Sequence, residues 1–311
     1  MYRLLPAYLK GRYYSKIFDR SRDRICRLRK VLADRRSIEV LDLLLKSYTT
    51  IQNNSTTYYL RAAEPLSPEK SYSTQEGYLI QETKEMYFRD EIHHFKERFG
   101  IDRPIVLLDG GAYTGDTLLS AAEGIQEGLL PQIEYAYAFE PDPINYSYMQ
   151  RILTDIPFPV ETFNCGLDDH DGKEQFCWEG VRTRINTDGG IFGAGEAFAG
   201  QELPVINMGA FLESLQNRAS LKEEVLSRFS KNQKPPNFIK LDIEGREREA
   251  ILSASAYIRN HHPDLAISIY HRPEDLWDIP LMIHSIYDKY RIFIRHNSNY
   301  YTETVCHAIC E

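Results

Sequence analysis

The chain has 311 residues, 42% of them hydrophobic, and a formal net charge of −8 at pH 7. This length predicts one large domain, or one domain with an extension, and the composition supplies enough apolar residues for a sizeable core. No apolar run approaches the length of a membrane span, and an acidic body disfavours nucleic acid as a partner.

The cysteines and the first residues bear on the compartment. The five cysteines form no C-x-x-C pair, which favours a reducing environment and gives no zinc signature. The first stretch, MYRLLPAYLKGRYY, lacks the apolar centre of a secretory signal. We therefore expect a cytoplasmic protein without a transmembrane segment.

The N-terminal region is strongly basic. Residues 1–36 contain twelve Lys or Arg and three Asp, a charge of +9, so the remaining residues carry −17. Apolar residues at helical spacing over 17–49, interrupted between Asp34 and Ser37, predict two helices. We expect this arm to pack on its own acidic domain. The alternatives are an anionic membrane surface, a nucleic acid, or a second copy of the chain in a homo-oligomer.

Two less regular stretches follow the arm. Residues 50–76 are polar and contain prolines, which predicts a linker. Residues 83–99 have helical spacing and carry Tyr87, which would line a pocket or, as we favour, pack in a core. Residues 1–100 are thus predicted to form a helical N-terminal extension with a linker, and residues 101–311 the main domain.

The strongest local pattern begins at residue 105. The branched apolar residues Ile105–Leu108 are typical of a buried parallel strand. Two glycines then allow a sharp turn, and Thr114-Gly115-Asp116 begins an amphipathic helix. Strand, glycine turn and helix predict the first unit of a doubly wound α/β sheet. Its ligand would lie at the carboxyl end of the strand, over the helix N-terminus.

The spacing and charge of this turn indicate which ligand it holds. A nicotinamide dinucleotide fingerprint needs G-x-G-x-x-G, whereas the glycines here stand at positions 110, 111 and 115. Asp109 and Asp116 flank the turn and would repel a pyrophosphate. The pattern therefore disfavours a nicotinamide dehydrogenase and favours a cationic ligand.

An acid after the next strand supports the same ligand class. The predicted second strand, 135–139, ends in Glu140, which is placed to accept hydrogen bonds from two ribose hydroxyls. S-adenosylmethionine has a ribose diol, an ammonium and a sulfonium, and it has no phosphate. The alternative is that Asp109 caps a helix and Glu140 is a surface charge. Because both acids follow strand ends in order, we favour the cofactor.

Three motifs in this order resemble the FkbM family of S-adenosylmethionine-dependent methyltransferases: DGGAYTGDT, AFEPDP and FIKLDIEG. The resemblance extends from about Val106 to Ala308. It implies a class I methyltransferase fold, which is Rossmann-like, with a mostly parallel seven-stranded sheet and an antiparallel last strand. It also implies methylation of a hydroxyl oxygen on a polyketide, a glycan or another small molecule.

The turn after the predicted third strand, 160–165, is similar to the family's adenine-binding turn. There, Asp169 matches the family's acid best, and Asp168 is its neighbour; a solvent-exposed turn is the alternative. The expected cofactor site comprises Asp109, Gly110, Gly111, Ala112, Tyr113, Gly115, Asp116, Glu140, Pro141, Asp142, Gly166, Leu167, Asp168, Asp169 and Asp242.

An antiparallel excursion is predicted next, beginning with a strand at 175–178. A glycine-rich loop at 186–195 follows and would close over a substrate. In the strand 205–209, Gly209 stands where the family usually has an Asp, so any role of that Asp is in doubt here. A helix from residue 211 to residue 229 completes the excursion.

The remaining pattern completes the sheet. Strands are predicted at 238–245 and 264–271, separated by a helix over 246–259. Two further strands, at 291–296 and 304–309, form a terminal hairpin that supplies the antiparallel strand implied by the resemblance.

Methylation of a hydroxyl requires alignment of the reacting atoms and removal of a proton. The candidates at the strand exits are Asp242, Glu244 and His271. In an extended chain Asp242 and Glu244 would share a face, and adjacent carboxylates raise the pKa of one of them. His271 suits a base directly. The alternatives are that Asp242 orients the cofactor, Glu244 caps the next helix and His271 bonds a loop carbonyl.

Two further alternatives remain open. The same three side chains could hold Mg²⁺ or Mn²⁺, which we do not favour from the sequence. The chain could also be a non-catalytic protein that keeps the cofactor fold as a binding scaffold. Acids at three strand exits favour the enzyme, with a small-molecule or glycan hydroxyl as acceptor and no nucleic-acid substrate.

Overall fold

The computed structural model describes residues 16–50, 84, 86–179, 182–185, 201–216, 234–297 and 302–310. The predicted linker 50–76 and the glycine-rich loop 186–195 lie outside these residues or at their margin. No helix of the described residues is both long enough and apolar enough to cross a membrane.

The main sheet has seven strands in the order β10-β11-β9-β8-β1-β2-β3. β1, β2, β3, β8 and β9 pair in parallel, and β11 is antiparallel to both β9 and β10. The predicted mostly parallel sheet with an antiparallel last strand is therefore confirmed. The strands are β1 Ile105–Gly110, β2 Ile133–Phe139, β3 Val160–Phe163, β8 Phe238–Leu241, β9 Asp264–Ser268, β10 Arg291–His296 and β11 Thr304–Ile309.

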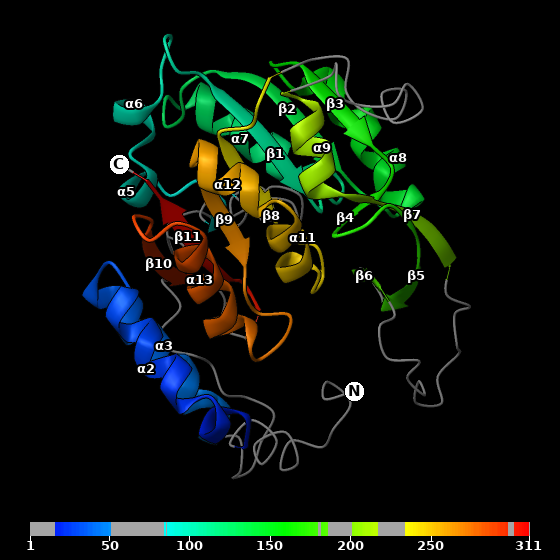
Figure 1. Ribbon diagram of the computed structural model, residues 1–311. Helices are drawn as coiled ribbons and strands as arrows, with labels where there is room; N and C mark the ends of the chain where they lie inside the picture. Colours follow the sequence, from blue (N-terminus) through cyan, green and yellow to red (C-terminus); the bar gives the residue numbers. More distant parts are fainter. Residues whose placement is uncertain are drawn as a thin grey trace.

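Helices cover both faces of this sheet (Figure 1). Alternate residues of β1 enter two different cores, with Leu107 in one and Leu108 in the other. This is the burial pattern of a strand in the centre of a doubly wound sheet. The helices are α7 Asp116–Gln126, α8 Pro143–Ile152, α9 Met208–Ser214, α11 Glu247–Ser253, α12 Ser255–His261 and α13 Asp275–Ile286, with a 3-10 turn η2 at Leu153–Asp155.

Two helix predictions are corrected by the structure. The helix expected over 246–259 is two helices, because the chain leaves helical geometry at Ala254. The helix expected over 83–99 is interrupted at His94, whose φ of 48° separates α5 Asp90–His93 from α6 Phe95–Arg98. A non-glycine residue in the left-handed region ends a helix locally, and the spacing of apolar residues does not predict where such a residue occurs.

A second sheet of four strands has the order β4-β7-β5-β6. The predicted antiparallel excursion is confirmed by the pairing of β5 with β7. The strands are β4 Gly166–Asp168, β5 Gly172–Glu179, β6 Arg182–Ile185 and β7 Gln201–Asn207. Gly209, just after β7, packs so tightly that a Cβ there would lie 2.1 Å from the Ser253 carbonyl oxygen. This contact excludes an Asp at position 209 without a local rearrangement.

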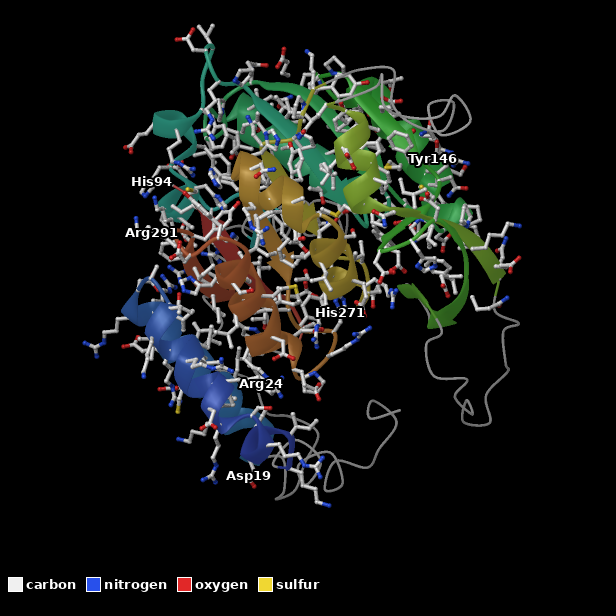
Figure 2. The ribbon with its side chains drawn as sticks, viewed as in Figure 1. Asp19, Arg24, His94, Tyr146, His271 and Arg291 are labelled. Atoms are coloured by element: carbon white, nitrogen blue, oxygen red, sulfur yellow. The ribbon has the colours of Figure 1, made fainter. Side chains whose placement is uncertain are left out.

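The described part of the basic arm packs on the main domain, as expected. It forms α2 Arg22–Val31 and α3 Arg35–Thr50, so the two predicted helices are present, with the break at 32–34, just before the predicted position. Arg24 of α2 reaches Asp278 of α13 at 2.8 Å, and Figure 2 shows Arg24 on the side of α2 that faces α13. Residue Leu28 is fully buried in the same interface. Whether residues 1–100 and 101–311 are separate domains stays a prediction.

Asp34 fastens α3 to the sheet, and we expect Asp34→Ala to lower the free energy of unfolding by about 1–2 kcal/mol. Its carboxylate accepts from the backbone N–H of Ser37 at 2.8 Å and from Arg295 at 2.6 Å. The variant loses a helix cap and leaves a buried guanidinium without its acid. Urea denaturation is the measurement. Equal stability of Asp34→Ala and the unchanged chain would contradict this role.

Candidate functional site

The turn after β1 needs its glycines. Gly111 has a φ of 74°, and a Cβ there would lie 1.9 Å from the carbonyl oxygen of Asp242. The backbone N–H groups of Gly111 and Ala112 donate to the Phe139 carbonyl at 3.0 and 2.9 Å. Gly115 has a φ of 93° immediately before α7. The turn is thus locked between the end of β2 and the chain leaving β8.

The segments expected to hold the cofactor converge at this edge of the sheet. A Cβ on Gly110 would lie 2.7 Å from the Leu241 side chain and 2.9 Å from that of Leu167. A Cβ on Gly166 would lie 3.9 Å from Pro141. The ends of β1, β2 and β8 therefore meet β4 within van der Waals distance.

Lys240 has a role that the sequence did not reveal. Its side chain is buried and pairs with Asp109 at 2.9 Å. Its ammonium also donates to the Gly111 carbonyl at 2.7 Å. Burial lowers the pKa of Lys240, but the carboxylates of Asp109, Asp242 and Asp116 together outweigh burial and raise this pKa. The Lys240–Asp109 pair therefore fixes the backbone of the glycine turn at Gly111.

Glu140 is fixed by two backbone groups. It accepts from the N–H of Tyr113 at 2.9 Å and from the N–H of Asp142 at 2.8 Å. Burial raises its pKa to about 8, although both backbone bonds oppose this. Asp142, also expected in the cofactor site, instead caps α8 by accepting from the N–H groups of Ile144 and Asn145 at 2.7 and 3.2 Å.

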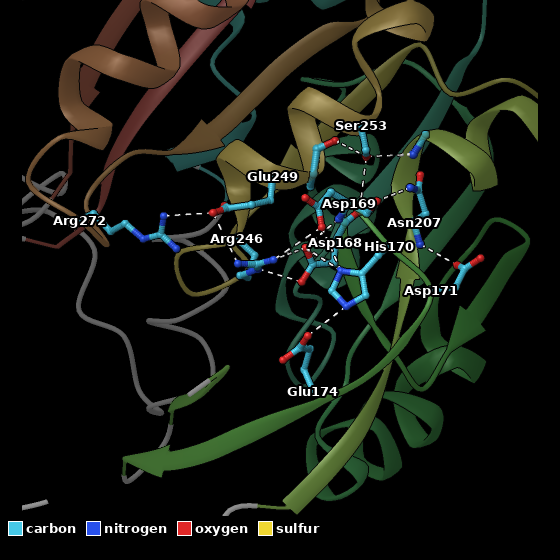
Figure 3. A network of polar contacts seen from close by, with 12 residues as sticks. Asp168, Asp169, His170, Asp171, Glu174, Asn207, Arg246, Glu249, Ser253 and Arg272 are labelled. Atoms are coloured by element: carbon cyan, nitrogen blue, oxygen red, sulfur yellow. Dashed lines mark hydrogen bonds and ion pairs between the residues drawn. The ribbon is translucent and has the colours of Figure 1, made fainter. Parts of the chain in front are cut away.

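The predicted adenine turn is part of the polar network in Figure 3. Asp168 is buried, and its carboxylate accepts two bonds from the guanidinium of Arg246, one of them at 2.8 Å. Asp169 is largely exposed and pairs with His170 at 2.9 Å. Asp168 is therefore engaged by Arg246, which the sequence did not single out, and the adenine prediction now depends on Asp169.

Asp242 accepts hydrogen bonds from the buried Tyr87 and the half-buried Tyr270. The hydroxyl of Tyr87 donates to it at 2.8 Å, and that of Tyr270 at 3.0 Å. Burial alone would raise the pKa of Asp242, but nearby positive charge and these two bonds hold it below its usual value. If one of the two carboxylates has a raised pKa, as predicted, it is not Asp242. The core role that we favoured for Tyr87 is incomplete, because its hydroxyl belongs to the site.

Glu244 and His271 also lie beside Asp242, for a reason other than the one predicted. β8 ends at Leu241, and Glu244 has a φ of 54°, so the strand does not continue through both acids. Yet Nε2 of His271 lies 3.3 Å from Asp242 Oδ1 and 3.6 Å from Glu244 Oε2. Figure 2 places His271 beyond the end of β9.

The other ring nitrogen of His271 faces Glu247, which the sequence did not single out. Nδ1 lies 3.0 Å from Glu247 Oε1, and both side chains are buried. Burial lowers the pKa of His271, but Glu247, Glu244 and Asp242 together raise it to about 10. In this arrangement the imidazole keeps its proton at neutral pH, and the base role expected of His271 stays a prediction.

The topology and the site together define a class of protein. A seven-stranded sheet with an antiparallel β11, a glycine turn after β1 and an acid after β2 are the features of a class I methyltransferase. The Methyltransferase FkbM domain matches this chain over residues 109–299, and the chain belongs to that family.

A solved structure agrees on the fold. Methyltransferase FkbM from Methylobacillus flagellatus KT superposes with a TM-score of 0.63 and 24% sequence identity, over 94% of this chain and 60% of its own. This chain therefore spans well under two thirds of that protein. A Clostridium thermocellum protein assigned as an rRNA methylase gives a TM-score of 0.35 and 10% identity over 78% of this chain and 99% of its own, which is too low to support an argument. No curated protein matches the sequence.

Proposed function

We propose that the chain binds S-adenosylmethionine and transfers its methyl group to a hydroxyl oxygen of a small molecule or glycan. The observation that carries the cofactor is Glu140. Its carboxyl group stands at the end of β2, fixed by the N–H groups of Tyr113 and Asp142. A carboxyl group held in this way has oxygen lone pairs left to accept from two ribose hydroxyls.

The charge around the turn supports a cofactor with positive groups and no phosphate. Burial raises the pKa of the Tyr113 phenol, and Asp116, Glu140 and Asp142 raise it further, so three acids surround one ring. Asp109 contributes to the shape of the turn indirectly, because it pairs with Lys240, which donates to the Gly111 carbonyl. A pyrophosphate would be repelled here, whereas an ammonium or sulfonium would be stabilised.

The residues at the ends of β8 and β9 would act on the acceptor. The cofactor, when bound, supplies a methyl group on a good leaving group. Asp242, oriented by Tyr87 and Tyr270, is placed to accept a hydrogen bond from an acceptor hydroxyl and align it. Glu244 is the candidate for the proton, because its carboxylate faces the same space and is 19% exposed.

Isothermal titration with S-adenosylhomocysteine, with NAD as the control ligand, tests the cofactor. We expect micromolar binding of S-adenosylhomocysteine and none of NAD. If S-adenosylhomocysteine fails to bind, the enzyme proposal is wrong, and a non-catalytic scaffold takes its place. Alanine at Glu244 and His271 separates these functions further, since an enzyme would lose turnover while it kept the cofactor.

Because of Glu140, the affinity for S-adenosylhomocysteine should increase with pH. Its raised pKa, about 8, means that the carboxylate forms only as the pH rises through that value. Ribose hydroxyls favour the carboxylate, so the affinity for S-adenosylhomocysteine should rise by roughly tenfold from pH 6.5 to 8.5. Glu140→Gln should bind at least about tenfold more weakly at pH 8.5 and lose this rise. A rise of the same size in Glu140→Gln would show that another group is responsible.

A further inference from the structure

Three carboxylates surround the imidazole of His271. Asp242 and Glu244 face Nε2, at 3.3 and 3.6 Å, and Glu247 faces Nδ1 at 3.0 Å. The imidazole is 3% exposed and Glu247 is 1% exposed, while the side chains of Asp242 and Glu244 are about one fifth exposed. Lys240, whose charge acts on Asp242, is already paired with Asp109. Such a concentration of negative charge around one ring favours a cation in its midst.

Glu247 directs the ring. Its Oε1 accepts from the backbone N–H groups of Ile243 at 2.8 Å and Gly245 at 3.4 Å, and the same oxygen faces Nδ1 of His271. One carboxylate therefore fixes the loop that carries Asp242 and Glu244 and also turns Nε2 toward them. A carboxylate behind a histidine in this arrangement is the usual support of a histidine that binds a metal through its other nitrogen.

The distances at Nε2 favour a shared ion over direct hydrogen bonds. Charge-assisted N–H···O bonds are about 2.7–2.9 Å long. The distances from Nε2 to Asp242 and Glu244 are 3.3 and 3.6 Å. Ligand atoms bound to one ion at about 2.0–2.3 Å lie roughly 3.0–3.5 Å from each other. Each of the two oxygens thus lies at about the distance from Nε2 that two ligands of one ion have from each other.

We propose that Asp242, Glu244 and His271 bind a divalent cation, which replaces the proton on Nε2 of His271, with Glu247 as the positioning residue of His271. One imidazole with two carboxylates suits Mn²⁺, since carboxylates favour hard ions and imidazole favours transition metals. Because Asp242 and Glu244 are partly exposed, the remaining positions are open to water or a substrate oxygen. The metal site stands by itself. That the ion would bind and acidify the acceptor hydroxyl rests on the proposed function.

A second group of similar composition does not form such a site. The ligand atoms of Asp168, Asp169 and His170 lie within 4.8 Å of one another, as do those of Asp242, Glu247 and His271. The carboxylate of Asp168 is already held by two bonds from the guanidinium of Arg246 (Figure 3). A cation there would have to displace a fixed positive charge, so His170→Gln serves as a matched control for His271→Gln.

Electron paramagnetic resonance of free Mn²⁺, titrated into the full chain, tests the proposal. We expect one bound Mn²⁺ per chain with a dissociation constant on the order of 10 µM. His271→Gln and Glu244→Gln should each weaken binding at least about tenfold, and Glu247→Gln about 10–100-fold. His170→Gln should bind as the unchanged chain does. Absence of bound Mn²⁺ at about 1 mM, or equal binding by the His271→Gln and Glu244→Gln variants, would overturn the site.

Failure of the metal is distinguishable from failure of the proposed function. S-adenosylhomocysteine binding is measured on the same preparations without added metal. A chain that binds S-adenosylhomocysteine but not Mn²⁺ keeps its proposed function and lacks the metal site. A variant that no longer binds Mn²⁺ but still binds S-adenosylhomocysteine is folded. Its loss of Mn²⁺ binding then supports the proposed metal site.

Discussion

Gly111→Ala is expected to destabilise the chain by about 3 kcal/mol or more and to abolish binding of S-adenosylhomocysteine. An alanine at the φ of 74° found here is strained by about 1–2 kcal/mol. Its Cβ would also lie 1.9 Å from the carbonyl oxygen of Asp242. That oxygen belongs to backbone, so the turn and the loop after β8 must move apart. Urea denaturation and isothermal titration measure the two effects.

Gly128→Ala is the control that separates the effect of backbone strain from the effect of the steric clash at Gly111. Gly128 has a similar φ of 67°, and no atom of the described residues lies within 4 Å of the position of its Cβ. We expect backbone strain alone to destabilise this variant, by about 1–2 kcal/mol, and its binding of S-adenosylhomocysteine to be unchanged. Equal effects of the two substitutions would mean that the contact between Gly111 and Asp242 does not hold the site together.

The fold could be predicted because its determinants are local. Ile105–Leu108 forms a strand that is buried on both faces, and the glycines after it permit a turn that few other residues allow. The hairpin of β10 and β11 follows from two apolar runs close in sequence. Where the predictions failed, at His94 and Ala254, the cause was a single backbone angle that residue spacing does not encode.

The site could be predicted only in part, because its partners are far apart in the chain. The alternation that was expected to align Asp242 with Glu244 fails at the end of β8; a left-handed Glu244 brings the acid back toward His271. Tyr87 bonds Asp242 across 155 positions. Glu247 did give a signal, since an acid in the first turn of a helix is favoured by the helix dipole, but its histidine lies after a different element, β9.

Lys240→Met is expected to lower the free energy of unfolding by about 3–5 kcal/mol, because it leaves Asp109 charged, buried and without its partner. Both side chains are almost wholly buried, 2.9 Å apart. The substitution also removes the donor to the Gly111 carbonyl, so binding of S-adenosylhomocysteine should weaken as well. Methionine fills similar volume, which makes lost packing a minor contribution. Urea denaturation is the measurement.

Lys234→Met is the matched control. Lys234 pairs with Glu134 at 2.7 Å, but both side chains are about two fifths exposed, so its loss should cost less than about 1 kcal/mol. Adding Asp109→Asn to Lys240→Met should restore part of the stability, since the remaining group no longer carries a buried charge. A double variant as unstable as the sum of the two single ones would show that Lys240 acts through the turn carbonyls rather than through Asp109. In that case the main contribution of Lys240 to stability is its hydrogen bond to the Gly111 carbonyl, and its ion pair with Asp109 contributes little.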